Sequence, residues 1–337
     1  MAFYSYIFTA NYKRYNERIK KIAKNETRSS LLLKLDNFIC VFRYGMGLTD
    51  YINFEIYKKG KAERVEYASI KAQNLFYETV SPSEFKKDYT VKPRFLEKFK
   101  DYCKRDFVVP NGDNFEQFEE FLNNNPVYME KPYDGLGGAG VRKVKAKDNE
   151  DRQKYYNWLV ENKVFIEQLV SQHDKMNELC PTSVNTLRVV TFNNNGKPRI
   201  IWCGLRIGNG VNCVDNFHAG GMCINVDINT GRLYGEAIDM ARNTHESHPV
   251  TKVKFDGFEL PYFKEMKEMV LKASLESDKI LVVGWDVALT PEGPVIIEGN
   301  RRPGFDIIQA LSKRGRKDIM REVLIDLGRE DIIKKLK

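Results

Sequence analysis

The chain has 337 residues, of which 42% are apolar and 30% charged, and its formal net charge is +8. These values describe an ordinary globular protein that is long enough for two domains. No apolar run approaches the roughly 18–20 residues of a membrane-spanning helix, and no recognised nucleic-acid-binding motif accompanies the positive charge. The composition therefore argues against a transmembrane segment and against nucleic acid as a partner.

The positive charge is concentrated near both ends, between Lys13 and Lys24 and between Lys313 and Lys337. A solvated surface explains such clusters, and the alternative is attraction to an acidic partner such as a nucleotide, an acidic glycan or an anionic membrane surface. The six cysteines form no C-x-x-C pair, and no basic stretch precedes the apolar residues at the start. We therefore expect buried thiols, no secretory signal and a cytoplasmic protein.

Helical patterns dominate residues 1–84. The segments 13–24 and 70–80 are predicted helices. A third helix, over 31–44, is expected to pack four apolar residues into a core: Leu32, Leu35, Ile39 and Phe42. We predict a small, mainly helical N-terminal region here, and the sequence does not indicate its role.

A glycine-rich loop follows a predicted strand over 126–131, which ends in Lys131. The loop carries four glycines: Gly135, Gly137, Gly138 and Gly140. Glycine lets backbone N–H groups approach and cradle phosphate, and the lysine adds a positive charge. The chain then resumes as a strand over 141–144, which argues against a P-loop or a dinucleotide fingerprint and leaves a flexible surface turn as the alternative.

Strands and hairpins dominate the next hundred residues. We predict a strand over 163–170, a hairpin that joins 186–192 to 198–206, and a second hairpin that joins 222–228 to 232–234. Apolar residues at helical spacing then predict a core-facing helix over 260–277.

The segment 283–304 carries the most informative pattern. Two apolar runs flank Pro291-Glu292-Gly293, which predicts a three-residue hairpin loop that pairs Thr290 with Pro294 and Asp286 with Glu298. Because side chains alternate along a strand, Asn300 shares the face of both carboxylates. A two-residue loop would instead place the carboxylates on opposite faces.

Two carboxylates and an amide oxygen suit Mg²⁺ that is shared with substrate phosphates, and the adjacent Arg301 and Arg302 suit phosphate oxygens. The metal ligands predicted here are Asp286, Glu298 and Asn300. A hairpin with a polar, solvated side is the alternative.

The order of the glycine loop, the strand at Glu167 and this hairpin resembles the ATP-grasp superfamily. More narrowly, the segments 183–189 and 215–221 resemble its sugar-transfer-associated branch, which is found with exopolysaccharide and capsule biosynthesis. The resemblance covers roughly residues 85–312, and its most specific part is the closing E-x-N…P-G pattern over 298–304.

The resemblance implies an α+β fold of the ATP-grasp type, in which two α+β subdomains with antiparallel sheets grip ATP after a small, mainly helical N-terminal region. It implies an ATP-grasp domain over 85–337. The expected parts of this domain are 85–170 with the glycine loop and the hinge, 171–312 with the metal and substrate subdomain, and a basic helical tail over 313–337.

The resemblance also implies roles for single residues. Lys131 resembles the lysine that contacts ATP phosphate, and Lys92 stands in the place of the earlier phosphate-binding lysine, for which Lys86, Lys87 and Lys98 also compete. The segment 167–170 resembles the adenine hinge, with Glu167 at its start and the Val170 N–H as donor.

Other residues resemble positions around the nucleotide. The acid that binds ribose is either Asp174 or Glu178. Arg188 and Arg206 resemble site arginines for a phosphate or a substrate carboxylate and, with Arg301 and Arg302, form the expected catalytic set. The candidate substrate contacts are Asp215, Asn216, His218, Gly220 and Gly221, of which His218 is equally well explained as a core histidine.

The implied activity is that of an ATP- and Mg²⁺-dependent, ADP-forming carboxylate–amine ligase that acts through an acylphosphate. Its expected partners are small carboxylate and amine substrates, including a sugar acid or an acidic glycan precursor, in cell-surface polysaccharide biosynthesis. The alternatives are a phosphotransferase and a nucleotide-binding scaffold. Many ATP-grasp ligases carry an α/β domain before the ATP-binding part, but residues 1–80 show no strand–helix alternation, so the acceptor site is not assigned.

Overall fold

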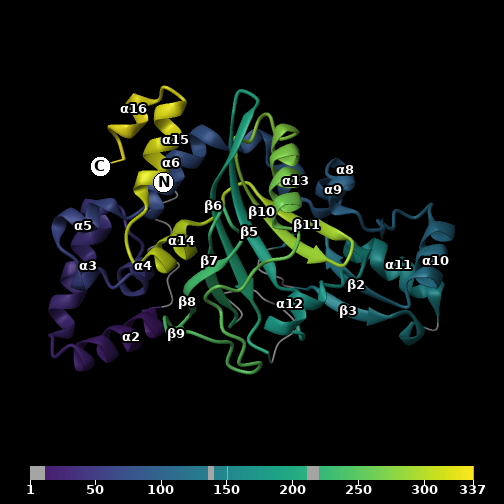
Figure 1. Ribbon diagram of the computed structural model, residues 1–337, viewed down its shortest axis with the longest axis horizontal. Helices are drawn as coiled ribbons and strands as arrows, with labels where there is room; N and C mark the ends of the chain where they lie inside the picture. Colours follow the sequence, from purple (N-terminus) through teal and green to yellow (C-terminus); the bar gives the residue numbers. More distant parts are fainter. Residues whose placement is uncertain (1–11, 136–139, 150, 211–219, 337) are drawn as a thin grey trace. The chain divides into compact units, whose positions relative to one another are not determined.

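The computed structural model describes residues 12–135, 140–149, 151–210 and 220–336. Contacts between residues divide the chain into two compact units. The helical unit combines 1–82 with 304–337, and the sheet unit covers 83–303 (Figure 1). The predicted domain limits stay predictions, and we describe the two units one at a time.

The described residues of the helical unit form helices and their connections, without strands. Gly45 ends one of these helices in the left-handed conformation, with φ of 64°, and its N–H bonds to the Val41 carbonyl. The helices are α2 Tyr12–Asn25, α3 Ser30–Tyr44, α4 Leu48–Asn53, η1 Ile56–Lys58, α5 Lys61–Glu66, α6 Ile70–Val80, α14 Phe305–Ser312, α15 Lys317–Asp326 and α16 Glu330–Ile333. The three helices predicted from the first 84 residues are therefore confirmed as α2, α3 and α6.

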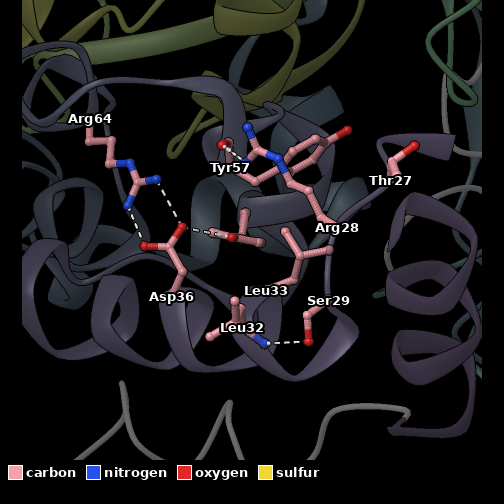
Figure 2. Close-up of a pocket in the computed structure, with 9 residues that line it drawn as sticks. Thr27, Arg28, Ser29, Leu32, Leu33, Asp36, Tyr57 and Arg64 are labelled. Carbon is pink, nitrogen blue, oxygen red and sulfur yellow. Dashed lines mark hydrogen bonds and ion pairs between the residues drawn. The ribbon is translucent and has the colours of Figure 1, made fainter. Parts of the chain in front are cut away.

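The buried face of α3 is not the predicted one. The residues that it buries are Leu33, Asn37, Cys40 and Val41. The four predicted core residues are all exposed: Leu32, Leu35, Ile39 and Phe42. Apolar residues occur on every side of this helix, so their spacing does not define one inner face. Beside α3 lies a cavity of about 560 Å³ in which Arg64 and Asp36 form a bidentate ion pair (Figure 2).

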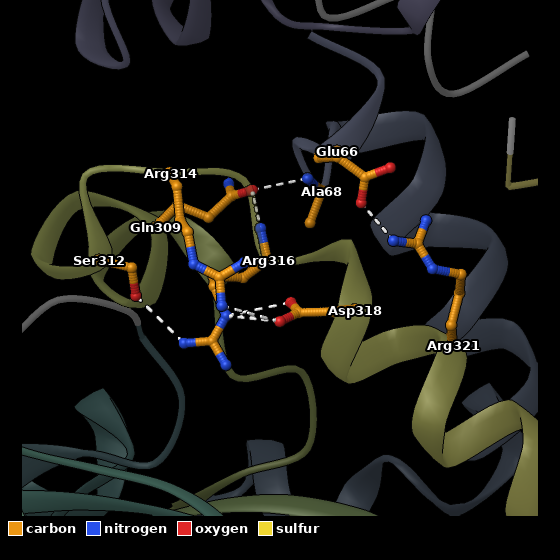
Figure 3. A network of polar contacts seen from close by, with 8 residues as sticks. All are labelled: Glu66, Ala68, Gln309, Ser312, Arg314, Arg316, Asp318 and Arg321. Atoms are coloured by element: carbon orange, nitrogen blue, oxygen red, sulfur yellow. Dashed lines mark hydrogen bonds and ion pairs between the residues drawn. The ribbon is translucent and has the colours of Figure 1, made fainter. Parts of the chain in front are cut away.

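The C-terminal helices pack with the N-terminal ones inside the helical unit. The buried Gln309 side chain accepts hydrogen bonds from the backbone N–H groups of Ala68, at 2.6 Å, and Arg316, at 3.3 Å (Figure 3). Arg321 forms an ion pair with Glu66. Residues 304–337 therefore complete the core of this unit.

The sheet unit contains two antiparallel sheets. The smaller has the order β1-β4-β2-β3, with β1 Phe107–Val108, β2 Val127–Pro132, β3 Arg142–Lys145 and β4 Val164–Gln168. The larger has the order β11-β10-β5-β6-β7-β8-β9. Its strands are β5 Thr186–Asn194, β6 Lys197–Ile207, β7 Met222–Val226, β8 Leu233–Asp239, β9 Thr244–His245, β10 Val282–Thr290 and β11 Gly293–Asn300. The strands and hairpins predicted from the sequence are confirmed.

Helices cover both sheets. They are η2 Ser83–Phe85, α7 Lys87–Thr90, α8 Lys92–Lys98, α9 Lys100–Cys103, α10 Phe115–Asn124, η3 Ala146–Asp148, α11 Arg152–Asn162, α12 Asp174–Leu179 and α13 Phe263–Leu275. The predicted core-facing helix is α13, which packs against β5 and β6 through Met266, Val270 and Ala273 (Figure 1). Trp285 is fully buried in the same core, and its indole N–H donates to the Thr191 hydroxyl at 2.8 Å.

The β10–β11 hairpin has a different turn from the predicted one. Thr290 pairs with Gly293 rather than with Pro294, so the loop contains two residues. A β-bulge then restores the predicted pairing, because Val287 pairs with Ile296 whereas Asp286 pairs with Glu298. Ile297 is the extra residue of the bulge, and without it the two carboxylates would lie on opposite faces of the hairpin.

No helix among the described residues is long and apolar enough to cross a membrane. The cysteines among the described residues are all buried: Cys40, Cys103, Cys180, Cys203 and Cys223. The sixth, Cys213, lies outside the described residues.

We expect Gly315→Ala to destabilise the helical unit by about 1–3 kcal/mol, because overpacking forces the backbone to shift. A Cβ at this position would lie 2.3 Å from the Glu66 carbonyl. Gly60→Ala is the matched control, since its Cβ would meet only the Glu63 carboxylate at 3.8 Å; it should cost less than about 1 kcal/mol. Equal unfolding free energies for the two variants in urea would contradict the packing of residues 304–337 with the N-terminal helices.

Candidate active site

Two carboxylates face each other across the β10–β11 hairpin. Asp286 is fully buried, whereas Glu298 lies opposite it and is exposed along one side. The Asn300 amide lies beside both, with its nitrogen 3.5 Å from an Asp286 oxygen and 3.4 Å from a Glu298 oxygen. The structure therefore brings together the three residues that the sequence predicts as metal ligands.

Two arginines from neighbouring strands hold Asp286. Arg188 on β5 makes a bidentate contact with its carboxylate, and Arg206 on β6 approaches the Oδ2 atom to 2.9 Å. Arg206 also donates to the Thr186 hydroxyl at 2.6 Å, which fixes its orientation. Burial by itself would raise the pKa of Asp286, but the two guanidinium groups outweigh it and lower the pKa to about 2.

The pKa of Glu298 shifts in the opposite direction. The protein that surrounds its carboxyl group raises the pKa, and repulsion from the Asp286 carboxylate raises it further. Because Asp286 is already matched by two arginines, Glu298 is the carboxylate at which an added cation relieves the greater electrostatic cost. Two carboxylates with pKa values pushed apart in this way are typical of functional sites.

The smaller sheet contributes a second charged cluster. Lys131 at the end of β2 forms an ion pair with Glu167 on β4, and Glu167 also accepts from the Arg105 Nε at 3.2 Å. All three side chains are largely buried. The Glu167 carboxylate is therefore matched by two cations, and it fixes the Lys131 ammonium at the end of the strand that leads into the glycine loop.

Arg105 is a site residue that the sequence did not reveal. Its Nη1 and Nη2 atoms donate to the carbonyls of Ile296 and Ile297 at 2.6 and 2.9 Å. Ile297 is the bulge residue that sets the register of Glu298. One guanidinium thus connects the Glu167 strand to the bulge of the β10–β11 hairpin.

Lys92 lies close to both clusters. Its ammonium donates to the Gly135 carbonyl at 3.1 Å, where the glycine loop begins. Burial lowers the pKa of Lys92, the Glu298 carboxylate opposes this shift, and the Lys131 ammonium adds to it. Lys92 therefore lies close enough to Glu298 and to Lys131 for both charges to act on it.

The glycine loop is described at its two ends only. Gly135 and Gly140 both adopt positive φ, at 136° and 75°. Gly137 and Gly138 lie outside the described residues, as do the candidate substrate contacts Asp215, Asn216 and His218.

A cavity of about 360 Å³ adjoins the segment that follows β4. Residues 168–171, which include the predicted hinge donor Val170, line one side of it, and the tip of the β10–β11 hairpin lines another. Arg105 lies in the same wall. Asp174 and Glu178 are both exposed and lie one turn apart on α12, so the structure leaves the choice of a ribose-binding acid open.

The remaining candidates lie at strand ends. Arg301 and Arg302 follow directly after β11, and both are half-buried. Burial and the neighbouring Arg302 lower the pKa of Arg301. Gly220 and Gly221 precede β7, which pairs with the strand of Arg206. Three other lysines compete with Lys92 for its predicted role: Lys86, Lys87 and Lys98. Of these, Lys98 pairs with Asp88 at 3.2 Å.

A protein-family model described as sugar-transfer associated ATP-grasp matches residues 102–323, about two thirds of the chain. The chain belongs to the sugar-transfer associated ATP-grasp family. The resemblance seen in the sequence is therefore confirmed. So is the predicted α+β fold class, an ATP-grasp domain with antiparallel sheets and a helical N-terminal region.

Solved ATP-grasp structures share little sequence identity with this chain. The ATP-grasp ligase PsnB, complexed with a phosphomimetic variant of its minimal precursor, Mg and ADP, is 15% identical with a TM-score of 0.45, over 74% of this chain and 62% of that chain. The D-alanine–D-alanine ligase from Coxiella burnetii is 11% identical with a TM-score of 0.41, over 73% of this chain and 61% of that chain. The chain thus spans less than two thirds of either protein. No curated protein matches the sequence.

We expect Arg105→Ala to lower the free energy of unfolding by about 3–5 kcal/mol, because it leaves the buried Glu167 carboxylate with one partner fewer. The measurement is urea denaturation of the full chain. Arg94→Ala is the control, since Arg94 forms an exposed ion pair with Asp88 whose loss should cost less than about 1 kcal/mol. A loss for Arg105→Ala no larger than that of the control would show that the buried network does not stabilise the sheet unit.

Proposed function

We propose that this family member is an ATP- and Mg²⁺-dependent, ADP-forming ligase that joins a carboxylate to an amine through an acylphosphate. The observation that carries the proposal is the convergence of Lys92, Lys131 and Glu298. Together with Arg188 and Arg206, these side chains present cations to phosphate oxygens and a carboxylate to a metal ion.

The donor set fits a resident Mg²⁺. Asp286, Glu298 and Asn300 would hold it, and Mg²⁺ commonly takes only one or two protein carboxylates and completes its octahedron with phosphate oxygens and water. Among the described residues, no three His, Cys, Asp or Glu side chains form a cluster able to bind a metal by themselves, so a phosphate-dependent site fits better than a structural one. When bound, the ion would neutralise charge on the β- and γ-phosphates.

The side chains of this chain would position and neutralise the reactants. Lys92 and Lys131 face the phosphates, and the buried Glu167 and Arg105 fix the Lys131 ammonium. A substrate carboxylate oxygen attacks the γ-phosphorus, and the bond to the β,γ-bridging oxygen breaks to release ADP. An amine then attacks the acyl carbon and loses a proton, so that an amide forms and inorganic phosphate leaves. Such transfer needs placement and charge neutralisation rather than a nucleophilic side chain.

The substrate class follows from the family description and stays part of the proposal. We propose a small carboxylate such as an amino acid, a sugar acid or an acidic glycan precursor, an amine acceptor, and a role in cell-surface polysaccharide biosynthesis on the cytoplasmic side. For the nucleotide, Val170 is the proposed hinge donor, and Asp174 or Glu178 the proposed ribose ligand. Asp215, Asn216, His218, Gly220 and Gly221 are the proposed substrate contacts, and Arg301 and Arg302 complete the proposed catalytic set.

Two other functions use the same site. A phosphotransferase would leave phosphate on the acceptor rather than free in solution. A nucleotide-binding scaffold would bind ATP without turnover across a wide panel of substrates. Mass spectrometry of the products after incubation with ATP, Mg²⁺ and pooled amino acids and sugar acids separates both from a ligase.

We expect Glu298→Gln to lower the rate of ADP release by about 100-fold or more, because it removes the carboxylate that is available to the metal. The measurement is Mg²⁺-dependent release of ADP and phosphate in the presence of both substrates, with circular dichroism to show that the fold is kept. Glu268→Gln on the exposed face of α13 is the matched control and should keep full activity. Full activity of Glu298→Gln would refute the proposed metal site.

A further inference from the structure

The helix α8 contacts both sheets of the sheet unit. At its start, the Lys92 backbone N–H donates to the carbonyl of Tyr133, the residue that follows β2, at 2.8 Å. One turn later, Phe95 packs against Gly299 on β11. One short helix therefore carries Lys92, whose ammonium contacts the start of the glycine loop, and also lies against the strand that carries Glu298.

Gly299 lies between Glu298 and Asn300 in the sequence and has no room for a side chain. A Cβ at this position would lie 2.5 Å from Phe95 Cε2 and 3.1 Å from Cζ, whereas nonbonded carbon atoms prefer about 3.5–4.0 Å. Gly299 is part of a β-strand and is not one of the glycines with positive φ, so its backbone conformation suits other residues as well. The close approach of Phe95 is therefore what requires glycine here.

The Phe95 ring has no space into which it could move aside. It is only 3% exposed and lies among three aromatic rings at centroid distances of 6.0, 4.8 and 6.5 Å: Tyr89, Phe99 and Trp285. Trp285 pairs with Gly299 across the β10–β11 hairpin, so Phe95 packs against both strands of that hairpin. Because close-packed interiors transmit a displacement, a methyl group added at Gly299 would shift the α8 backbone as well as the ring.

A shift of α8 at Phe95 would also move Lys92. Residues three apart are neighbours on one side of a helix, and they lie about 4.5 Å apart along its axis. Lys92 is also the residue of α8 on whose charge the Glu298 carboxylate acts.

We propose that Phe95 and Gly299 are positioning residues for Lys92. Their contact sets how closely α8 approaches β11, and thereby the distance between the Lys92 ammonium and the Glu298 carboxylate. The inference rests on the function proposed above, in which Lys92 faces the nucleotide phosphates and Glu298 the metal ion. The distance between these two groups then decides how well ADP with Mg²⁺ fits the site.

The test is a double-mutant cycle on the affinity of the full chain for ADP with Mg²⁺, measured by calorimetry. Lys92→Met should cost the wild type about tenfold in affinity, because it removes a charge-assisted hydrogen bond to phosphate. Gly299→Ala should by itself cost at least about tenfold, and Lys92→Met should then cost less than about threefold more. A merely structural role of Gly299 would leave the cost of Lys92→Met the same in both backgrounds, and that result would overturn the inference.

Two further variants separate this contact from a general loss of stability. Phe95→Leu/Gly299→Ala makes room for the added methyl group and should restore both the affinity and the full cost of Lys92→Met. Gly204→Ala is the matched control, because its Cβ would overpack the same sheet 2.5 Å from Trp202, and there Lys92→Met should keep its full cost. Failure of the double variant to regain affinity, or loss of the Lys92→Met cost in Gly204→Ala, would overturn the inference.

Phe95→Leu alone provides the test if Gly299→Ala does not fold. It opens a gap over Gly299, so Lys92→Met should again cost less than about threefold. Phe121→Leu is its control, because Phe121 is a similarly buried ring on α10, and Lys92→Met should keep its full cost there. Equal costs of Lys92→Met in these two variants would contradict the positioning role.

Crystal structures of the wild type and Gly299→Ala decide the inference without nucleotide. The α8 backbone at Lys92 should lie about 1 Å farther from β11 in the variant, and an unmoved α8 would overturn the inference. If Lys92→Met costs the wild type no affinity, the role of Lys92 in the proposed function fails, and the position of α8 in these structures alone decides whether Phe95 and Gly299 position it.

Discussion

The sheet unit depends on one buried guanidinium group. Arg105 donates to the Glu167 carboxylate in the smaller sheet and to the carbonyls of Ile296 and Ile297 in the larger one. A buried arginine is tolerated only where its donors are matched, and here the main acceptors come from two distant parts of the chain. The same contact therefore joins the two sheets and holds the bulge that places Glu298 opposite Asp286.

The charges around this contact are balanced in pairs. Asp286 is matched by Arg188 and Arg206, and Glu167 is matched by Arg105 and Lys131. The protein around the Glu298 carboxyl group and the charge of Asp286 raise the pKa of Glu298. Burial lowers the pKa of Lys92, and the charge of Lys131 adds to this shift. In the function that we propose, a metal ion would offset the first cost and phosphate oxygens the second, so binding of the nucleotide complex would complete the electrostatic balance of the site.

Much of the sheet unit could be predicted from the sequence, because alternation of apolar and polar residues specifies strands and their faces. The pairing of Asp286 with Glu298 was predicted correctly through two errors that cancel: the turn is one residue shorter than expected, and the bulge adds one residue. The alternation of apolar residues along a strand does not reveal a β-bulge, because the bulge depends on hydrogen bonds to its backbone from other parts of the protein.

Other features depend on contacts between distant residues. Arg105 belongs to a charged run, Lys104-Arg105-Asp106, that is typical of a protein surface, and its main partners lie 62 and 191 residues away in the sequence. The α3 helix carries apolar residues on all sides, so spacing alone does not select its buried face. On that face, the Asn37 side chain donates to the Tyr15 hydroxyl and to the Leu48 carbonyl, which are contacts between distant residues.

The most direct test of the central role of Arg105 is calorimetric titration of ADP into the wild type and Arg105→Lys, with and without Mg²⁺. A lysine keeps a positive charge beside Glu167, but one ammonium cannot reproduce the planar fork that donates to both carbonyls of the bulge. We predict that Arg105→Lys remains folded and binds ADP alone like the wild type, whereas its affinity for ADP with Mg²⁺ falls by at least about tenfold. An unchanged affinity in the presence of Mg²⁺, alongside Mg²⁺-enhanced binding by the wild type, would contradict the account.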